Sequence, residues 1–153
     1  MKIILDPGHG KNINRGIDPE YYEGNHVFTL AQYLKEELEK YADTEVFLTR
    51  TMAENPAVSA RGKLAVLKDA DVFLSLHTNA ASDSRACGVT IFRSVNRENS
   101  TALAKLLGER VTEAMNAATK ITYLRGVCTR TQVTNGKTEA VSYTHLTLPT
   151  IRL

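Results

Sequence analysis

Short apolar runs alternate with amphipathic stretches along most of the chain. Each run is rich in β-branched residues and leucine and ends near residues that favour turns, a pattern typical of strands buried in a sheet. The predicted strands are residues 3–5, 45–50, 71–77 and 88–92, with a further short strand at 125–131. Residues 11–22 are polar and contain Asn, Gly and Pro, so they predict a loop over the end of the first strand.

Three stretches between the strands repeat apolar residues at helical spacing, which predicts helices with one face toward a core. The first begins at Glu23 and runs for about four turns, Asn55-Pro56 opens the second, and the third covers residues 99–118. The expected core faces are Val27, Leu30, Ala31, Leu34 and Leu38, then Val58, Ala60, Leu64, Ala65 and Leu67, then Leu103, Leu106, Leu107, Val111 and Met115.

This order of strands and helices predicts an α/β fold. We expect a single domain with a twisted, mostly parallel sheet that is covered by helices on both faces. A length of 153 residues suits one domain with a core of its own.

The charge and composition of the chain argue against several classes of function. The formal charge is only +2 and the basic residues are scattered, which argues against nucleic-acid binding. No stretch reaches the roughly 20 apolar residues that a membrane span requires, and we expect no signal peptide in this chain. Cys87 and Cys128 belong to no CxxC pair, so we expect both to be small buried apolar side chains.

The candidate chemistry centres on two histidines. His9 and His77 each follow the carboxyl end of a predicted buried strand, and parallel neighbours would bring both rings into one crevice. Zinc prefers nitrogen and carboxylate ligands, and a hydrolytic site keeps three of them. Glu23, at the first turn of a helix that returns to the strand ends, is the best third ligand, ahead of Glu20 and Glu54.

Structural roles remain open for the same residues. Glu23 equally suits a favourable charge at a helix N-terminus, and a single buried histidine is usually hydrogen-bonded to backbone. His26 forms an ExxH pair with Glu23, but the other members of a di-iron set are absent, so we expect His26 to be an ordinary residue.

Several motifs, in order, resemble a known family. The sequence is similar to the zinc-dependent N-acetylmuramoyl-L-alanine amidases of the Amidase_3 type, cell-wall hydrolases found as autolysins, sporulation enzymes and phage endolysins. The likeness runs from the first residue to about residue 131. The stretches that carry it are Asp6–Gly10, Glu23, Leu48–Arg50, the helix of Arg61, and Phe73–Ala80.

The resemblance implies roles for individual residues. It makes His9, Glu23 and His77 the ligands of Zn²⁺, and peptidoglycan the substrate, cut between N-acetylmuramic acid and the L-alanine of the stem peptide. It also implies that Asn79 and the segment from Arg125 to Arg130 shape the groove. Bound zinc would acidify water and polarise the amide carbonyl, and a second carboxylate would transfer the protons.

The C-terminal part departs from the family pattern. The family carries its second glutamate at the end of a late apolar strand, whereas Glu139 precedes an apolar stretch, so the proton-transfer residue stays unknown. Residues 141–153 resemble a non-native translated tail, and His145 belongs to them. We therefore expect a catalytic domain at 1–140 whose last strand is missing or replaced, followed by an atypical tail at 141–153.

Three alternative functions follow from these expectations. The first is a peptidoglycan amidase; the alternative is a catalytically silent, zinc-dependent domain that binds peptidoglycan or regulates. A hydrolase of another amide on the same scaffold is also possible, since a fold does not fix function. We expect a monomer that acts at the bacterial cell wall, either released by lysis or carried as a domain of a longer secreted protein.

Overall fold

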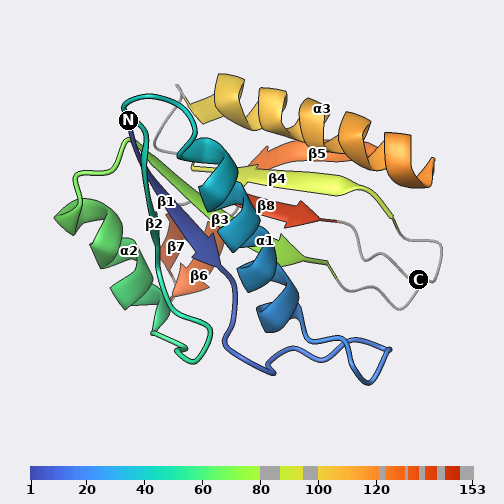
Figure 1. The fold of residues 1–153 in the computed structure, drawn as a ribbon, viewed down its shortest axis with the longest axis horizontal. Helices are drawn as coiled ribbons and strands as arrows, with labels where there is room; N and C mark the ends of the chain where they lie inside the picture. The colour runs from blue at the N-terminus through green and yellow to red at the C-terminus, as the bar shows by residue number, and fades with distance from the viewer. Residues whose placement is uncertain are drawn as a thin grey trace. The chain divides into compact units, whose positions relative to one another are not determined.

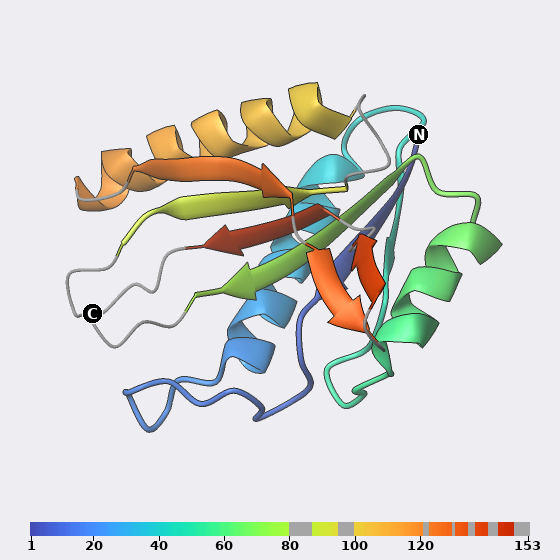
Figure 2. The ribbon, with the colours of Figure 1, turned by 180° about the vertical axis from the view of Figure 1, so that it is seen from behind.

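The chain folds as two compact units, Met1–His77 and Thr78–Leu153, in the computed structural model (Figures 1 and 2). The structure describes residues 1–79, 87–94, 100–120 and 123–129, and the backbone alone at 131–134, 137–140 and 144–148. Helices alternate with parallel strands in an α/β fold, which confirms the predicted fold class.

The first unit is built on three parallel strands. β1 (Lys2–Pro7) lies between β2 (Glu45–Leu48) and β3 (Val72–Thr78), with Ile4 in register with both Phe47 and Phe73. Five of the six β1 residues are buried, because a central parallel strand has neighbours on both edges and cover on both faces. Its carboxyl end, at Pro7, pairs with Leu76 beside the end of β3.

Helices α1 (Glu23–Leu38) and α2 (Val58–Leu67) complete this unit (Figure 1). The core face of α1 is confirmed at Val27 and Ala31, while Leu30, Leu34 and Leu38 are half-buried. Phe28, which the spacing did not select, is buried as well. The core of this unit consists of Ile3, Ile4, Leu5, Val27, Phe28, Ala31, Val46, Leu74 and Leu76.

The prediction for the core face of α2 is wrong. Val58 is 63% exposed and Leu67 is 81% exposed, Ala60 is also exposed, and Leu64 and Ala65 are only half-buried. The buried residue of α2 is instead Arg61, a basic side chain that the periodicity assigned to no core face. The guanidinium of this arginine bonds Asp6 and Pro7 of β1.

The second unit contains β4 (Val89–Arg93), which pairs in parallel with β5 (Leu124–Thr129) and antiparallel with β8 (Thr144–Leu148) (Figure 2). The predicted strand at 125–131 corresponds to β5 and to the start of β6 (Thr131–Thr134), which forms an antiparallel pair with β7 (Lys137–Ala140). Arg130 lies outside the described residues.

Helix α3 (Ser100–Thr119) packs on β4 and β5 through small residues. Ala104 and Gly108 are buried, and a Cβ at Gly108 would lie 2.8 Å from Leu124 Cδ1, so the helix comes too close for larger side chains there. The predicted core face is therefore wrong at Leu103 and Leu106, which are exposed, while Leu107, Val111 and Met115 are half-buried.

The prediction that both cysteines are buried is wrong. Cys87 is half-buried, and Cys128 is exposed because it lies on β5, an edge strand. No helix in the described part of the chain is long and apolar enough to cross a membrane. The tail at 141–153 contains β8, described by its backbone alone, and the domain limits 1–140 and 141–153 stay predictions.

Candidate metal centre

The turn after β1 places the first candidate ligand. The backbone N–H of Gly8 donates to the carbonyl of Leu76 at 3.0 Å, which continues the β1–β3 ladder to the edge of the sheet. His9 then adopts φ +59°, a left-handed conformation uncommon for histidine. The chain therefore leaves the strand sharply, with the His9 side chain held at the carboxyl end of the sheet.

His77 reaches the same place from β3. A Cβ at Gly8 would lie 2.3 Å from Cε1 of the His77 ring, so a glycine is required for the ring to lie against this turn. His77 is half-buried at the penultimate position of β3. Parallel pairing of β1 and β3 thus brings the two histidines together, as their sequence positions predicted.

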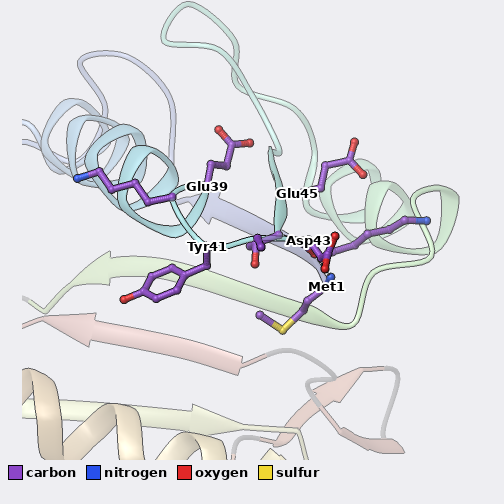
Figure 3. Close-up of a pocket in the computed structure, with 9 residues that line it drawn as sticks. Met1, Glu39, Tyr41, Asp43 and Glu45 are labelled. Carbon is purple, nitrogen blue, oxygen red and sulfur yellow. Dashed lines mark hydrogen bonds between the residues drawn. The ribbon is translucent and has the colours of Figure 1, made fainter.

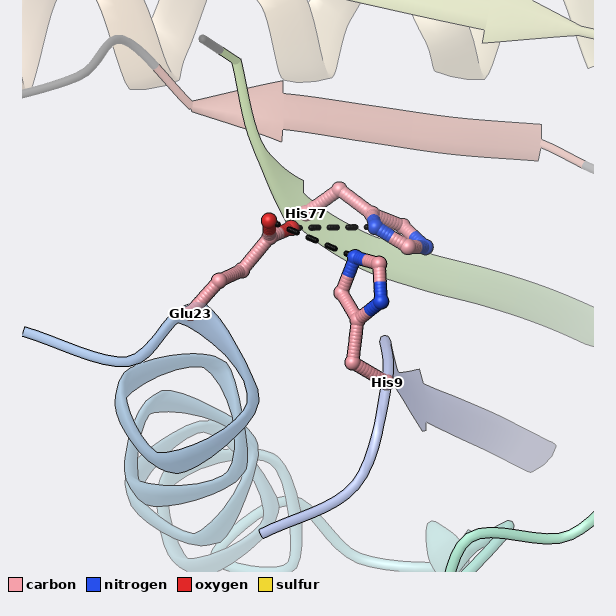
Figure 4. A group of neighbouring side chains, drawn as sticks. All are labelled: His9, Glu23 and His77. Atoms are coloured by element: carbon pink, nitrogen blue, oxygen red, sulfur yellow. Dashed lines mark hydrogen bonds and ion pairs between the residues drawn. The ribbon is translucent and has the colours of Figure 1, made fainter. Parts of the chain in front are cut away.

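The Glu23 carboxylate faces both rings (Figure 4). It is the first residue of α1 and is 2% exposed. Its Oε1 lies 3.0 Å from His77 Nδ1, and its Oε2 lies 3.3 Å from His9 Nε2. The two rings meet edge to face, with centroids 5.1 Å apart. One ligand atom from each residue lies within 4.8 Å of the others, so the group could hold a metal ion.

The alternative carboxylates Glu20 and Glu54, and His26, lie outside the cluster. Glu20 and Glu54 are exposed, and Glu54 accepts a hydrogen bond from the backbone N–H of Thr51. His26 is exposed and stacks on Tyr21, with ring centroids 4.4 Å apart. Within the described residues, the cluster that could bind a metal consists of His9, Glu23 and His77.

The chemistry of this donor set fits a divalent metal such as zinc. Two imidazole nitrogens and one carboxylate oxygen are the ligands of many hydrolytic zinc sites. Burial lowers the pKa of His9, and the charges of His77, Arg61 and Arg50 lower it further against the opposing effect of Glu23. A lowered pKa favours the neutral imidazole, which is the form that binds metal.

Asn14, in the loop before α1, contacts two of the three residues. Its Nδ2 donates to Glu23 Oε2 and lies 3.4 Å from His9 Nε2, while its backbone carbonyl accepts from the N–H of Glu23 at 2.9 Å. The residue adopts φ +58°, which asparagine tolerates better than most residues. The loop therefore lies at the rim of the site as predicted, but the sequence did not single out Asn14.

Two buried arginines hold the backbone of the turn. Arg50 donates through Nε to Pro7 O at 2.8 Å and through Nη2 to Gly8 O at 3.0 Å and Gly24 O at 2.7 Å. Arg61 donates through Nη1 to Pro7 O at 2.9 Å and through Nη2 to His9 O at 2.8 Å. Both arginines belong to motifs noted in the sequence, although no role was assigned to either.

Asp6 completes the support beneath the turn. Its carboxylate accepts hydrogen bonds from Thr49 Oγ1 at 2.5 Å, Ser75 Oγ at 2.8 Å and Arg61 Nη1 at 2.9 Å. Burial alone would raise the pKa of Asp6, but these hydrogen bonds and the charge of Arg61 outweigh it and lower the pKa. Asp6 is thus a buried carboxylate fixed by three partners, and it balances the charge of Arg61.

The remaining predicted site residues belong to the second unit or have side chains outside the described residues. Asn79 directly follows β3 and is half-buried. The residues from Arg125 to Thr129 form β5 of the second unit. The side chain of Glu139, on β7, lies outside the described part of the chain, as does that of His145.

A pocket of about 610 Å³ lies at the other edge of the first unit, at the amino ends of β1 and β2 (Figure 3). Its side chains include Glu39, Tyr41, Asp43 and Glu45. Glu39 already pairs with Lys35 at 2.5 Å, and no histidine lines the pocket. It therefore offers no chemistry comparable with the histidine cluster.

A comparison with known protein families shows which family the chain belongs to. The Amidase_3 family, described as N-acetylmuramoyl-L-alanine amidase, matches residues 3–145. The chain belongs to this family. Relatives that match the chain in sequence include the N-acetylmuramoyl-L-alanine amidase AmiA of Salmonella typhimurium, 31% identical over 119 residues, and that of Escherichia coli, 30% identical.

The aligned regions cover 77% of this chain but 41% of each AmiA protein, so the chain spans about two fifths of the length of these relatives. Among solved structures, the catalytic domain of CwlV, an N-acetylmuramoyl-L-alanine amidase from Bacillus (Paenibacillus) polymyxa, superposes with a TM-score of 0.75 at 25% identity. That likeness covers 97% of this chain and 79% of the CwlV chain, and it agrees with the α/β fold described above.

Proposed function

We propose that this chain hydrolyses the amide bond between N-acetylmuramic acid and L-alanine in peptidoglycan, with zinc as its cofactor. The observation that carries the proposal is the buried Glu23, which contacts both His9 and His77, in a chain of the Amidase_3 family. Peptidoglycan as partner and the cell wall as the place of action follow from the same family membership.

In this proposal His9, Glu23 and His77 hold the metal. When bound, zinc acts as a Lewis acid that polarises the amide carbonyl and acidifies water. The protein's own contacts hold two of the three donors in place, because His77 lies against Gly8 and Glu23 is held by Asn14. A preorganised donor set of this kind keeps the reorganisation needed for binding small.

Hydrolysis also needs a group that accepts a proton and returns it to the departing amine. Glu23 is the carboxylate of the described cluster, and both of its oxygens already face histidines. That observation favours a second candidate function, a domain that binds zinc and peptidoglycan without turnover. The proton-transfer residue is left unassigned in both proposals.

One assay separates the two functions. Purified peptidoglycan is incubated with the zinc-loaded chain, and new L-alanine amino termini are counted by dinitrophenyl labelling. Amidase activity predicts new termini from the wild-type chain and none from His77→Ala. Retention of the chain on sedimented peptidoglycan without new termini would support the binding function. Neither retention nor release would contradict both proposals.

A further inference from the structure

Arg50 donates hydrogen bonds to two segments that carry proposed metal ligands, the turn of His9 and the start of α1. It is 4% exposed and directly follows Thr49, the first residue after β2. Its Nη2 donates at once to Gly8 O, in the turn that carries His9, and to Gly24 O, in the first turn of α1. Gly8 and Gly24 directly neighbour His9 and Glu23 in sequence.

We propose that Arg50 is a positioning residue that sets the separation of His9 and Glu23 and thereby the metal affinity of the site. The inference rests on the proposed metal site. A planar guanidinium with donors in a fixed fork can bond several carbonyls at once, whereas a lysine ammonium is a single point charge. Stacking of Arg50 over the Phe28 ring, 5.1 Å from its centroid, restricts the guanidinium further.

Close packing makes this coupling sensitive to small shifts. A Cβ at Gly24 would lie 1.9 Å from the carbonyl oxygen of Gly10, so the start of α1 rests directly against the turn. Arg61 also bonds the turn, at Pro7 O and His9 O, and its other hydrogen bonds go to Asp6, Asn55 and Pro56, none of which belongs to α1. Of the two arginines, Arg50 is therefore the one that ties the turn carrying His9 to the start of α1.

If Arg50 acted only through its charge, its removal would have the opposite effect on metal affinity. Arg50 is a buried positive charge close enough to lower the pKa of His9, and it would repel a bound cation. Removing that charge should tighten metal binding if charge were its main effect. Positioning predicts weaker binding, so the direction of the change distinguishes the two explanations.

The test measures zinc affinity by chelator competition, together with the d–d absorption of the Co²⁺-loaded chain, which reports ligand geometry. Arg50→Gln and Arg50→Lys are compared with the wild type. Two control variants are Val46→Ala, which weakens the buried core of the same unit, and Arg110→Gln, which removes an exposed cation of α3. Melting temperatures are recorded for all of them.

We expect both Arg50 variants to bind zinc about 10- to 100-fold more weakly, the usual effect of losing a group that orients metal ligands. Their Co²⁺ spectra should change in position and intensity, while those of Val46→Ala and Arg110→Gln match the wild type. The proposal is overturned if Arg50→Gln binds as tightly as the wild type, if Arg50→Lys restores affinity, or if Val46→Ala weakens binding equally.

A measurement on the wild type covers the case in which the Arg50 variants do not fold. The Nη protons of Arg50 should give resolved NMR signals with slow exchange and should shift when zinc is added, while those of Arg110 should not. Signals of Arg50 that average and exchange like those of Arg110 would overturn the proposal. A wild-type chain that takes up no zinc would instead contradict the metal site, and the exchange of the Arg50 protons would still test the coupling.

Discussion

The His77 ring lies against the backbone of Gly8, at a distance that leaves no room for even a methyl group between them. Gly8→Ala should therefore push the ring away from His9 and Glu23. We expect the variant to lose most of its zinc, by at least about tenfold in affinity, because the three donors no longer converge. Zinc content after dialysis against a weak chelator measures the effect.

Gly62→Ala is the matched control for this glycine variant. A Cβ at Gly62, in the interior of α2, meets no atom within 4 Å. Alanine has the higher helix propensity, so this change should stabilise the chain by roughly 0.5–1 kcal/mol and leave zinc content unchanged. Equal zinc loss in both variants would mean that the packing against His77 is unimportant.

The ligand residues themselves give the most direct prediction. We expect about one zinc per chain, abolished in His77→Ala and strongly reduced in Glu23→Ala, because each substitution removes one of three donors. Elemental analysis of the purified proteins checks this, with His26→Ala as a control on the Tyr21 stack outside the cluster. Undiminished zinc in both ligand variants would rule the site out.

Asp6 should make stability depend on pH in the acid range. Its pKa is lowered in the folded state, so its contribution is fully present above the unfolded pKa of about 3.9 and is lost as pH falls through the folded value. Asp6→Asn leaves Arg61 without its carboxylate and should cost roughly 3–5 kcal/mol at neutral pH.

Urea unfolding at several pH values tests the Asp6 prediction. The stability difference between the wild type and Asp6→Asn should shrink as the pH falls below about 4, since the wild-type carboxyl then becomes protonated. Asp69→Asn, at an exposed position after α2, should follow the wild-type curve. A difference that stays constant across this range would contradict an ionised Asp6 in the folded state.

Asn14 should act through its side chain rather than its backbone. Asn14→Ala loses the amide that bonds Glu23 and also places a Cβ-bearing residue at φ +58°, whereas Asn14→Gly loses the amide alone. We expect both variants to bind zinc about tenfold more weakly, with Asn14→Gly the more stable of the two. Wild-type affinity in Asn14→Gly would limit this residue to a backbone role.

The strands and the proposed ligand set could be predicted from the sequence because both follow from local pattern. Ile3–Leu5 is apolar throughout since β1 is central, and parallel strands bring His9 and His77 to one edge. Glu23 followed from the return of a helix to that edge. These inferences need only the order of the elements along the chain.

The supporting arginines could not be predicted in the same way. Arg61 lies on a helix whose apolar residues suggested another buried face, and its partners are backbone carbonyls, which carry no mark in the sequence. The exposure of Val58 and Leu67 has the same cause, because α2 meets the strand through Arg61. Asn14 depends on a left-handed backbone that the loop composition permits but does not specify.

His9, Glu23 and His77, with the two arginines and Asp6 that support them, all come from Met1–His77, the first compact unit. Substitutions after residue 77 therefore leave every proposed donor, and each of these supporting side chains, unchanged. The proposed metal site can thus be inherited intact while the second unit varies.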